Sequence, residues 1–324
     1  MIIKRIHIIM MLIIIDTNQE DILNKREIII TEVGPRDGFQ NEKQILDTAT
    51  KAKLINKSID AGFKSIEFGY FTDPERIPEL ADTEAVYQLL NKRADVDLKA
   101  LVEDMEGLKR AIATGVKNIK ISVSASNTYN LKKFQMTSDE TLENIRDRVE
   151  LAKHNNINLS CAVSTSFGCP YEGKMSIGTI ERIVKKLIDM GIGEIFISDT
   201  AGMGNPREVK EVFTCFVGKY PDTIFSAHFH NTRGMGLANV YAAIEAGVTR
   251  FDSSFGGLGG CPYVPGAKGN VSSEDLIYMM DEMGYETGVE LDKAIDVARY
   301  LEEVYGKEMN SYILKAGKAT DIIK

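Results

Sequence analysis

The 324-residue sequence has few cysteines, no excess of positive charge and no apolar run long enough to cross a bilayer. Its four cysteines form no CxxC pair, which argues against a disulfide framework and favours reduced thiols in a cytoplasmic protein. With 39 basic and 47 acidic residues, a net charge of -8 and a pI near 5.3, the chain lacks the basic surface of a general nucleic-acid binder. We therefore expect no nucleic-acid partner.

The first 27 residues differ in composition from the rest of the chain. Lys4 and Arg5 precede an apolar run over 8–15, which superficially resembles a secretion signal. The run is shorter than the ~20 residues that span a bilayer, and residues 16–20 offer no small-residue cleavage site. We interpret 1–27 as an N-terminal extension and expect no stable membrane insertion, with an export element or an over-long start as the alternatives.

From residue 28 onward, short β-branched apolar runs alternate with amphipathic helical windows. The predicted strands cover 28–33, 65–68, 98–102, 119–123, 159–163, 194–198, 223–228 and 250–254. The predicted helices cover 47–61, 83–91, 105–114, 138–155, 177–190, 206–219, 235–246 and 273–283. Eight such units predict an α/β fold, a (β/α)8 TIM barrel over 28–285, followed by a short C-terminal helical extension over 286–324 with a helix at 290–305. A doubly wound sheet has a similar rhythm, but no GxGxxG follows the first strand, which favours the barrel.

Several helix ends carry the residues expected there. Thr137, Ser138 or Ser176 can cap a first turn, and Pro206 suits the first position of a helix. Glycines 62, 115, 191 and 247 follow the last apolar residue of four predicted helices, where a left-handed backbone is needed.

The seventh predicted strand ends in His228-Phe229-His230. Side chains two apart on a strand project to the same face, so the two imidazoles form half of a metal site. In a barrel of this type the working residues lie at the carboxyl ends of the strands, where Asp37 follows strand one and Asn270 ends the loop after strand eight. Two imidazoles, a carboxylate and an amide oxygen suit a divalent cation, Mg²⁺ or Mn²⁺. Taken singly, Asp37 and Asn270 are equally explained as turn residues.

Four further polar residues are candidates for catalysis at the same mouth. Arg36 can hold an anionic enolate or carboxylate, with a surface Arg–Asp pair as the alternative. Glu67 and Asp199 are candidate proton-transfer groups that equally suit orienting metal-bound water or capping a helix. Cys261, between glycines and Pro262, can present a thiol on a mobile lid, although most cysteines are buried and structural.

These motifs together resemble the 3-hydroxy-3-methylglutaryl-CoA (HMG-CoA) lyase family. The matching stretches are 32–43 (EVGPRDGFQNEK), 168–173 (GCPYEG), 199–202 (DTAG) and, above all, 257–263 (GLGGCPY). The likeness spans about 28–285; the His-x-His and Arg-Asp pairs are shared by a wider group of metal-dependent barrel lyases and synthases, whereas the cysteine loop singles out the lyase branch. The chain departs from well-known members at Phe39 and at 68–71 (FGYF), which affects the expected substrate shape more than the chemistry.

The resemblance implies a metal ion held by Asp37, His228, His230 and Asn270. It further implies Arg36, Glu67, Asp199 and Cys261 as catalytic residues, with Arg36 stabilising enolate charge and Cys261 moving a proton. Gln40 and Lys43, in the first matching stretch, are the expected cofactor-binding residues. The implied reaction is a retro-Claisen cleavage of an acyl-CoA substrate to acetyl-CoA and acetoacetate, carried out by a homo-oligomer, a dimer.

Three alternative functions remain open at this point. A condensing synthase on the same barrel typically adds a long C-terminal portion, whereas about forty residues follow the eighth unit here. An aldolase acting on a free hydroxy-oxo acid would not need the cysteine loop. A non-catalytic barrel that binds an acyl-CoA or a metal is the alternative from another class.

Overall fold

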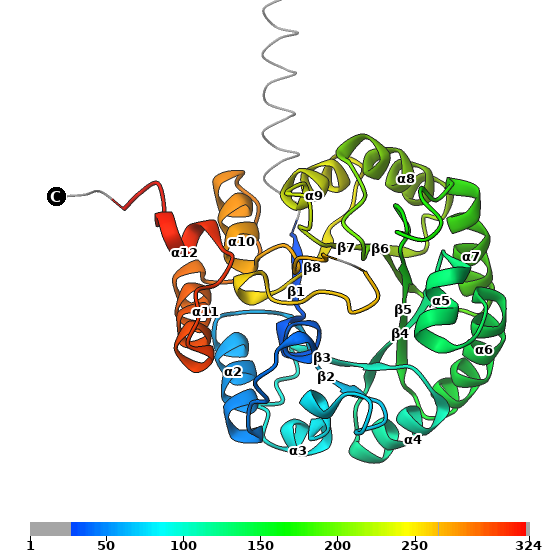
Figure 1. Ribbon diagram of the computed structural model, residues 1–324, viewed down its shortest axis with the longest axis horizontal. Helices are drawn as coiled ribbons and strands as arrows, with labels where there is room; N and C mark the ends of the chain where they lie inside the picture. Colours follow the sequence, from blue (N-terminus) through cyan, green and yellow to red (C-terminus); the bar gives the residue numbers. More distant parts are fainter. Residues whose placement is uncertain (1–26, 265, 322–324) are drawn as a thin grey trace, which may run out of the picture.

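Eight parallel strands close into a barrel in the computed structural model, which describes residues 27–264 and 266–321 (Figure 1). The strands are β1 Ile29–Glu32, β2 Ser65–Phe71, β3 Asp97–Val102, β4 Asn118–Ser124, β5 Asn158–Ser164, β6 Glu194–Asp199, β7 Ile224–Phe229 and β8 Arg250–Ser253. Each strand pairs with the next in sequence, and β8 pairs with β1 over the four residues Ile29–Glu32. The predicted TIM barrel is confirmed.

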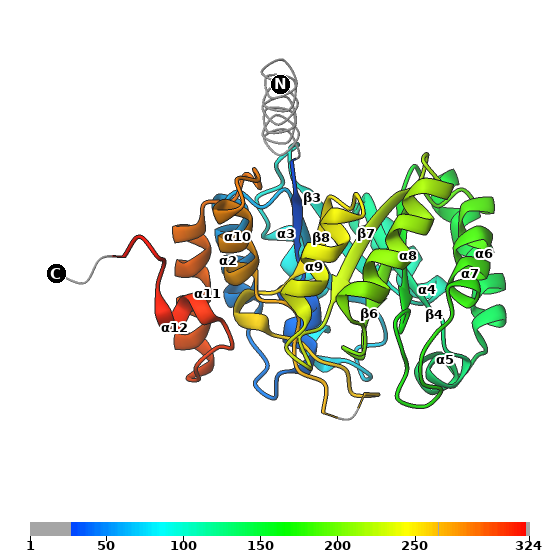
Figure 2. The ribbon, with the colours of Figure 1, turned by 90° about the horizontal axis from the view of Figure 1, so that it is seen from above.

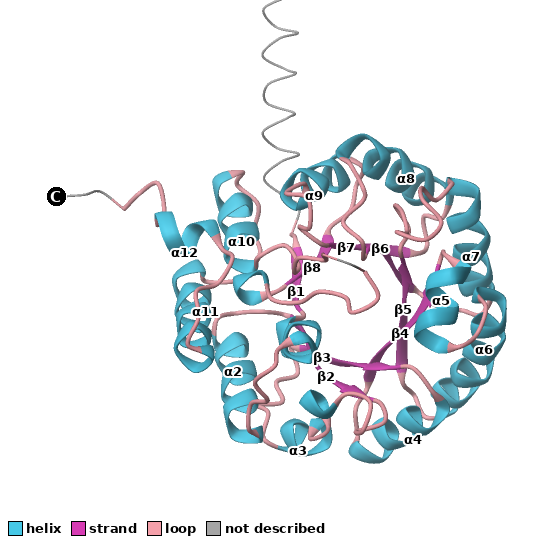
Figure 3. Cartoon of the chain, in the orientation of Figure 1, coloured by secondary structure: helices cyan, strands magenta, loops and turns pink. Residues whose placement is uncertain are grey.

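Helices form a ring outside the strands (Figure 3). The helices of the described residues, which also include α5 at the barrel mouth and α12 beside the barrel, are α2 Thr48–Asp60, α3 Thr83–Gln88, α4 Met105–Thr114, α5 Asn127–Phe134, α6 Ser138–His154, α7 Ile177–Asp189, α8 Pro206–Lys219, α9 Gly236–Glu245, α10 Ser273–Glu282, α11 Leu291–Tyr305 and α12 Tyr312–Ala316. Short turns η1 Gly34–Gly38, η2 Phe39–Asn41, η3 Pro78–Leu80 and η4 Phe255–Gly257 lie in the loops. No helix in the described part of the chain has the length and apolar character to cross a membrane.

The expected residues cap several helices. Thr137 forms a reciprocal capping box with Glu140 at the start of α6, and Ser176 accepts a hydrogen bond from the Thr179 amide at the start of α7. Ser138 is instead the first residue of α6. Gly62 has a φ of 101°, and a Cβ there would lie 2.2 Å from the Gly288 carbonyl oxygen, so this glycine is required both by its backbone conformation and by close packing.

Two elements at the barrel mouth differ from the prediction. β2 continues to Phe71 rather than ending at 68. All seven residues of this strand are buried, and its register on β3 shifts between Glu67 and Gly69. α5 was missed, because this short helix buries only Tyr129 and Asn130 and has no apolar stripe. Both differences alter the mouth of the barrel, since β2 and α5 contribute side chains to it.

The C-terminal segment lies beside the barrel, with α11 against α2 and α10 (Figure 1). The predicted helix at 290–305 corresponds to α11, and α12 was not predicted. Backbone hydrogen bonds from Ile28 to Glu286 and from Glu290 to Ala61 join the segment to the barrel. The division into 28–285 and 286–324 stays a prediction, and the predicted extension 1–27 lies outside the described residues except for its last residue.

Candidate active site

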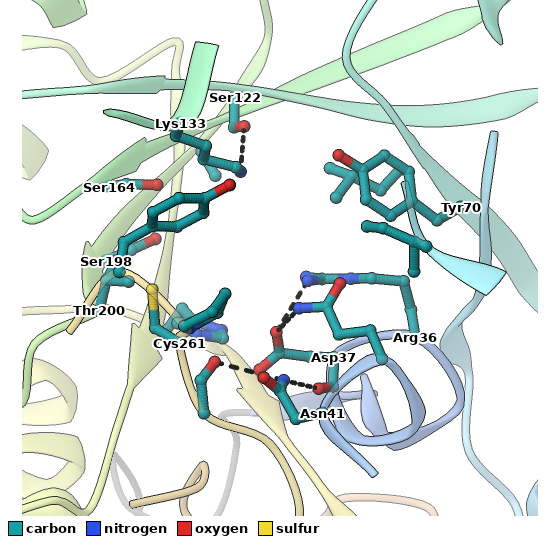
Figure 4. Close-up of a pocket in the computed structure, with 18 of the residues that line it drawn as sticks. Arg36, Asp37, Asn41, Tyr70, Ser122, Lys133, Ser164, Ser198, Thr200 and Cys261 are labelled. Carbon is teal, nitrogen blue, oxygen red and sulfur yellow. Dashed lines mark hydrogen bonds and ion pairs between the residues drawn. The ribbon is translucent and has the colours of Figure 1, made fainter. Parts of the chain in front are cut away.

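A cavity of about 300 Å³ opens at the carboxyl ends of the strands (Figure 4). It is lined from η1 by Arg36 and Asp37, from β7 by His228, and from the loop after β8 by Cys261. That loop crosses the barrel mouth in Figure 1, and Figure 2 shows it at the same end of the barrel as α5. Most of the predicted site residues therefore meet in one place, as the barrel geometry requires.

Three predicted metal ligands form a cluster in this cavity. One ligand atom from each of Asp37, His228 and His230 lies within 4.8 Å of the other two, and all three residues are buried. The two imidazole rings have centroids 5.0 Å apart. His228 lies in β7, whereas His230 follows the strand and forms a bridge with Asn270.

Asn270, the fourth predicted ligand, lies against this cluster. Its Nδ2 donates to Asp37 Oδ2 at 2.6 Å and to the Leu258 carbonyl oxygen at 2.9 Å, while its buried Oδ1 has no hydrogen-bond partner among the described residues. An unpartnered buried amide oxygen is costly unless a cation or donor occupies the space before it. Two imidazoles, a carboxylate and this oxygen therefore fit a divalent cation.

The protonation states of the cluster suit cation binding. Burial alone would raise the pKa of Asp37, but Arg36 and the two histidines outweigh it, so the pKa lies below its ordinary value. Burial lowers the pKa of His230 to about 4, with the neighbouring His228 as the next cause. At neutral pH the cluster thus presents an ionised carboxylate and, at His230, a neutral imidazole, the forms that coordinate metals.

Lys120 and Asp252 line the same cavity beside the cluster, and neither was predicted from the sequence. Asp252 Oδ2 lies 3.0 Å from His228 Nδ1, the arrangement that fixes the ring orientation of a ligating histidine. Lys120 Nζ lies 2.8 Å from the same Asp252 oxygen and 2.7 Å from Glu67 Oε2. The signal in the sequence was Lys120 itself, a lone charge inside an apolar strand pattern.

Arg36 continues this series of ion pairs beyond Glu67. Its Nε donates to Glu67 Oε1 and its Nη1 donates to Asp37 Oδ1 at 2.8 Å. Burial raises the pKa of an isolated carboxylate, yet Arg36 and Lys120 hold the pKa of Glu67 below its ordinary value. Glu67 is therefore an ionised acceptor that orients the guanidinium group.

Cys261 lies on the loop that crosses the mouth. Its Sγ is 3.1 Å from the hydroxyl of Tyr129, a residue of α5 that was not predicted to belong to the site. Burial raises the pKa of the Cys261 thiol, against the lowering effect of the Tyr129 hydroxyl. The thiol is consequently protonated at neutral pH, which suits a proton donor.

Asp199, Gln40 and Lys43 were also predicted to belong to the site. The Asp199 carboxylate accepts the backbone amides of Met203 and Gly204 at 2.8 and 2.9 Å and does not line the cavity, whereas its neighbours Ser198 and Thr200 do. Gln40 lines the cavity and donates to Asp37 Oδ1 at 3.1 Å. Lys43 is exposed and lies outside the cavity lining. The predicted roles of these three residues stay predictions.

Comparison with known proteins identifies similar chains over most of this length. The HMGL-like family model matches residues 27–301. Hydroxymethylglutaryl-CoA lyase YngG of Bacillus subtilis is 37% identical over 295 residues, which cover 91% of this chain and 99% of that protein. The mitochondrial hydroxymethylglutaryl-CoA lyase of Bos taurus is 37% identical over 291 residues, 90% of each chain.

A solved structure agrees with these relatives. An HMG-CoA lyase from Acinetobacter baumannii, in complex with coenzyme A and 3-methylmalate, superposes with a TM-score of 0.89 at 38% identity. The superposition covers 92% of this chain and 97% of that one. The similarity therefore extends over the entire barrel rather than over a single motif.

Proposed function

This chain belongs to the HMGL-like family, and we propose that it cleaves HMG-CoA, or a close 3-hydroxyacyl-CoA, to acetyl-CoA and acetoacetate. The observation that carries the proposal is the meeting of Asp37, His228 and His230 with Arg36 and Cys261 on one cavity. A carbon–carbon lyase of this kind needs a site for the substrate oxygens, a base that accepts the C3 hydroxyl proton, a group that stabilises the enolate and an acid that protonates it. The proton that the base gains balances the one that the acid gives up.

The cation proposed for this site is Mg²⁺ or Mn²⁺, held by Asp37, His228, His230 and Asn270. When bound, such an ion supplies Lewis-acid polarisation of substrate oxygens. The absence of cysteine from the ligand set and the presence of oxygen donors support a hard divalent ion over a closed zinc site.

The chain's own residues account for the rest of the chemistry. Arg36, oriented by Glu67, stabilises the negative charge that develops on the thioester oxygen as the carbon–carbon bond breaks. Cys261 Sγ donates its proton to the resulting acetyl-CoA enolate, and the loop that carries it excludes water from that enolate. Asp252 fixes the His228 ring, and Asp199 holds the turn at Met203 and Gly204 beside the mouth.

The direct test is incubation of the protein with Mg²⁺ or Mn²⁺ and HMG-CoA, followed by detection of acetoacetate. We expect acetoacetate and acetyl-CoA in equal amounts, and no reaction after chelation of the metal. Binding of HMG-CoA without turnover would favour a non-catalytic barrel, and cleavage of a free hydroxy-oxo acid without CoA would favour the aldolase. Either outcome would contradict the proposal.

Three finer expectations belong to the same proposal. The substrate is bound as a CoA thioester, the protein is a homodimer and it acts in the cytoplasm. The dimer is tested by light scattering coupled to size-exclusion chromatography, where a mass of twice 36.0 kDa is expected and a single-chain mass would contradict it.

Replacing Arg36 by lysine is expected to lower kcat about 10²-fold. Lysine keeps the charge but not the planar fork that binds Glu67 and Asp37 while facing the cavity. Steady-state kinetics with HMG-CoA measure the effect, and Arg110→Lys, on the outside of the barrel in α4, is the control that should leave kcat unchanged. An unchanged kcat with a raised KM in Arg36→Lys would assign Arg36 to ground-state binding.

Replacing Cys261 by serine is expected to lower kcat by about 10²-fold without loss of bound metal. A serine hydroxyl occupies nearly the same space but ionises far less readily than a thiol. Thiol reagents should inactivate the wild type, and substrate should protect it. Cys169→Ser is the matched control, because Cys169 is fully buried in the neighbouring loop; sensitivity that disappears only in this control would remove Cys261 from the proton transfer.

A further inference from the structure

Helix α5 holds Tyr129 in a fixed position at the mouth of the barrel. Ser126 caps the helix by accepting a hydrogen bond from the Tyr129 amide at 3.1 Å. The buried Asn130 side chain accepts a hydrogen bond from the Ser124 amide at the end of β4 and donates one to the Thr141 hydroxyl of α6. Tyr129 itself is 3% exposed. A buried side chain on a helix that is bound to two neighbouring elements can orient a group that it contacts.

The Tyr129 hydroxyl contacts one atom of the proposed chemistry, the sulfur of Cys261. The two atoms lie 3.1 Å apart. Tyr129 and Lys133 are four positions apart on α5, which places both side chains on the face of the helix that lines the cavity. The Tyr129 ring also packs edge-to-face on Tyr263, with centroids 6.0 Å apart and an interplanar angle of 76°. The ring therefore holds the loop two residues beyond Cys261 while the hydroxyl contacts the thiol.

A small apolar cluster, distinct from the main core, surrounds this contact. Its buried members are Tyr129, Cys169, Ala201 and Val264, and Cys261 packs against them. They come from α5 and from the loops after β5, β6 and β8. Because these side chains exclude water, the hydrogen bond between the hydroxyl and the sulfur is stronger than an exposed one.

Tyr129 is the donor of this hydrogen bond whenever the sulfur is a thiolate. Burial raises the pKa of Tyr129 well above its ordinary value, so the hydroxyl keeps its proton near neutral pH. A thiolate has no proton to donate, which leaves the hydroxyl as the donor. Burial raises the pKa of the Cys261 thiol, and the Tyr129 hydroxyl and the Tyr263 backbone amide oppose that rise. Both groups thus favour the thiolate.

We propose that Tyr129 is a positioning residue of the lyase reaction, which orients the Cys261 thiol and stabilises the thiolate that remains after proton transfer. This inference rests on the proposed function and adds a residue to it. In that step the enolate carbon forms a C–H bond with its own electron pair, the S–H bond breaks, and its electrons stay on the sulfur. The Tyr129 O–H bond remains intact. Its hydrogen bond strengthens as charge develops on the sulfur, and this lowers the barrier.

Replacing Tyr129 by phenylalanine removes the hydroxyl and keeps the buried ring. We expect kcat for HMG-CoA to fall about 10–100-fold, the effect of losing one hydrogen bond to a charged group, with KM and bound metal unchanged. Tyr171→Phe is the matched control. The Tyr171 hydroxyl donates at 2.5 Å to the Tyr263 carbonyl oxygen, on the same loop, rather than to the thiol. This control should leave kcat unchanged.

The pKa of the Cys261 thiol tests the same contact without substrate. Alkylation by iodoacetamide at a series of pH values, followed by mass spectrometry of the peptide that contains Cys261, measures it. Since the thiolate loses a donor, we expect a pKa about one unit higher or more in Tyr129→Phe, and no change in Tyr171→Phe. The other charged groups that act on the sulfur are Lys133 on α5 and Asp37 on η1, and both are unaltered in these variants.

Combining Tyr129→Phe with Cys261→Ala shows whether Tyr129 acts through the sulfur. Without the thiol, Tyr129→Phe should cause little further loss of kcat, because the two residues act as a unit. An undiminished further loss, a raised KM with unchanged kcat, or an unchanged pKa of Cys261 would each overturn this inference and leave the proposed function intact. Failure of the wild type to cleave HMG-CoA would overturn the proposed function and this inference with it.

Discussion

Replacing Asp37 or His228 by alanine is expected to lower turnover of HMG-CoA by about 10³-fold or more, together with a loss of bound metal. Each residue provides one of three clustered ligand atoms within 4.8 Å, and Lewis-acid stabilisation contributes several kcal/mol to such reactions. Asp37 also binds Arg36, Gln40 and Asn270, so its removal also disturbs Arg36, the residue proposed to stabilise the enolate. We therefore expect the larger loss in Asp37→Ala.

Metal content measured by mass spectrometry separates this effect from general damage. Both variants should lose the divalent ion that the wild type retains after dialysis. Asp139→Ala is the matched control, since Asp139 is an exposed carboxylate on α6 that pairs with Arg182 and Lys186. Full metal content and full turnover in both His228→Ala and His230→Ala would make the strand-seven histidines structural and contradict the assignment of the site.

The fold was predictable because its signals are local. Alternation of β-branched runs with helical windows sets the eight units, and the rule that barrels use the carboxyl ends of their strands then brings Asp37, His228 and Cys261 together. Neither step requires knowledge of a contact between distant residues. The prediction of these site residues thus followed from the barrel topology once the repeating strand–helix pattern had been recognised.

The residues that were missed depend on contacts between distant parts of the chain. Lys120 and Asp252 are 132 positions apart and meet only because β4 and β8 close the same barrel. Tyr129 lies on α5, whose sequence carries no apolar periodicity, and its contact with Cys261 again spans 132 positions. Asp199 was predicted as a site residue from its position at the end of a strand. That position does not reveal whether a carboxylate faces the cavity or accepts hydrogen bonds from the following turn, as Asp199 does.

Replacing Lys120 by methionine is expected to destabilise the protein by about 3–5 kcal/mol, because it leaves two buried carboxylates without their shared cation. The side chains of Glu67 and Asp252 are 0% and 1% exposed, so both carboxylates depend on buried partners such as this ammonium group. The same lysine joins two functional branches: Glu67 orients Arg36, and Asp252 orients His228. Metal affinity should therefore fall about 10–100-fold in addition to the loss of stability.

Lys99→Met separates these two consequences of losing a buried lysine. Lys99 is also buried in the barrel, pairing with Asp97 and Glu194 near the start of β3 and β6, but it does not line the cavity. Urea unfolding should show destabilisation in both variants, whereas metal titration and kcat should change only in Lys120→Met. If Lys99→Met weakened metal binding to the same extent, the effect of Lys120 would be one of general stability. The series of ion pairs that joins Arg36 to His228 through Lys120 would then not position the site residues.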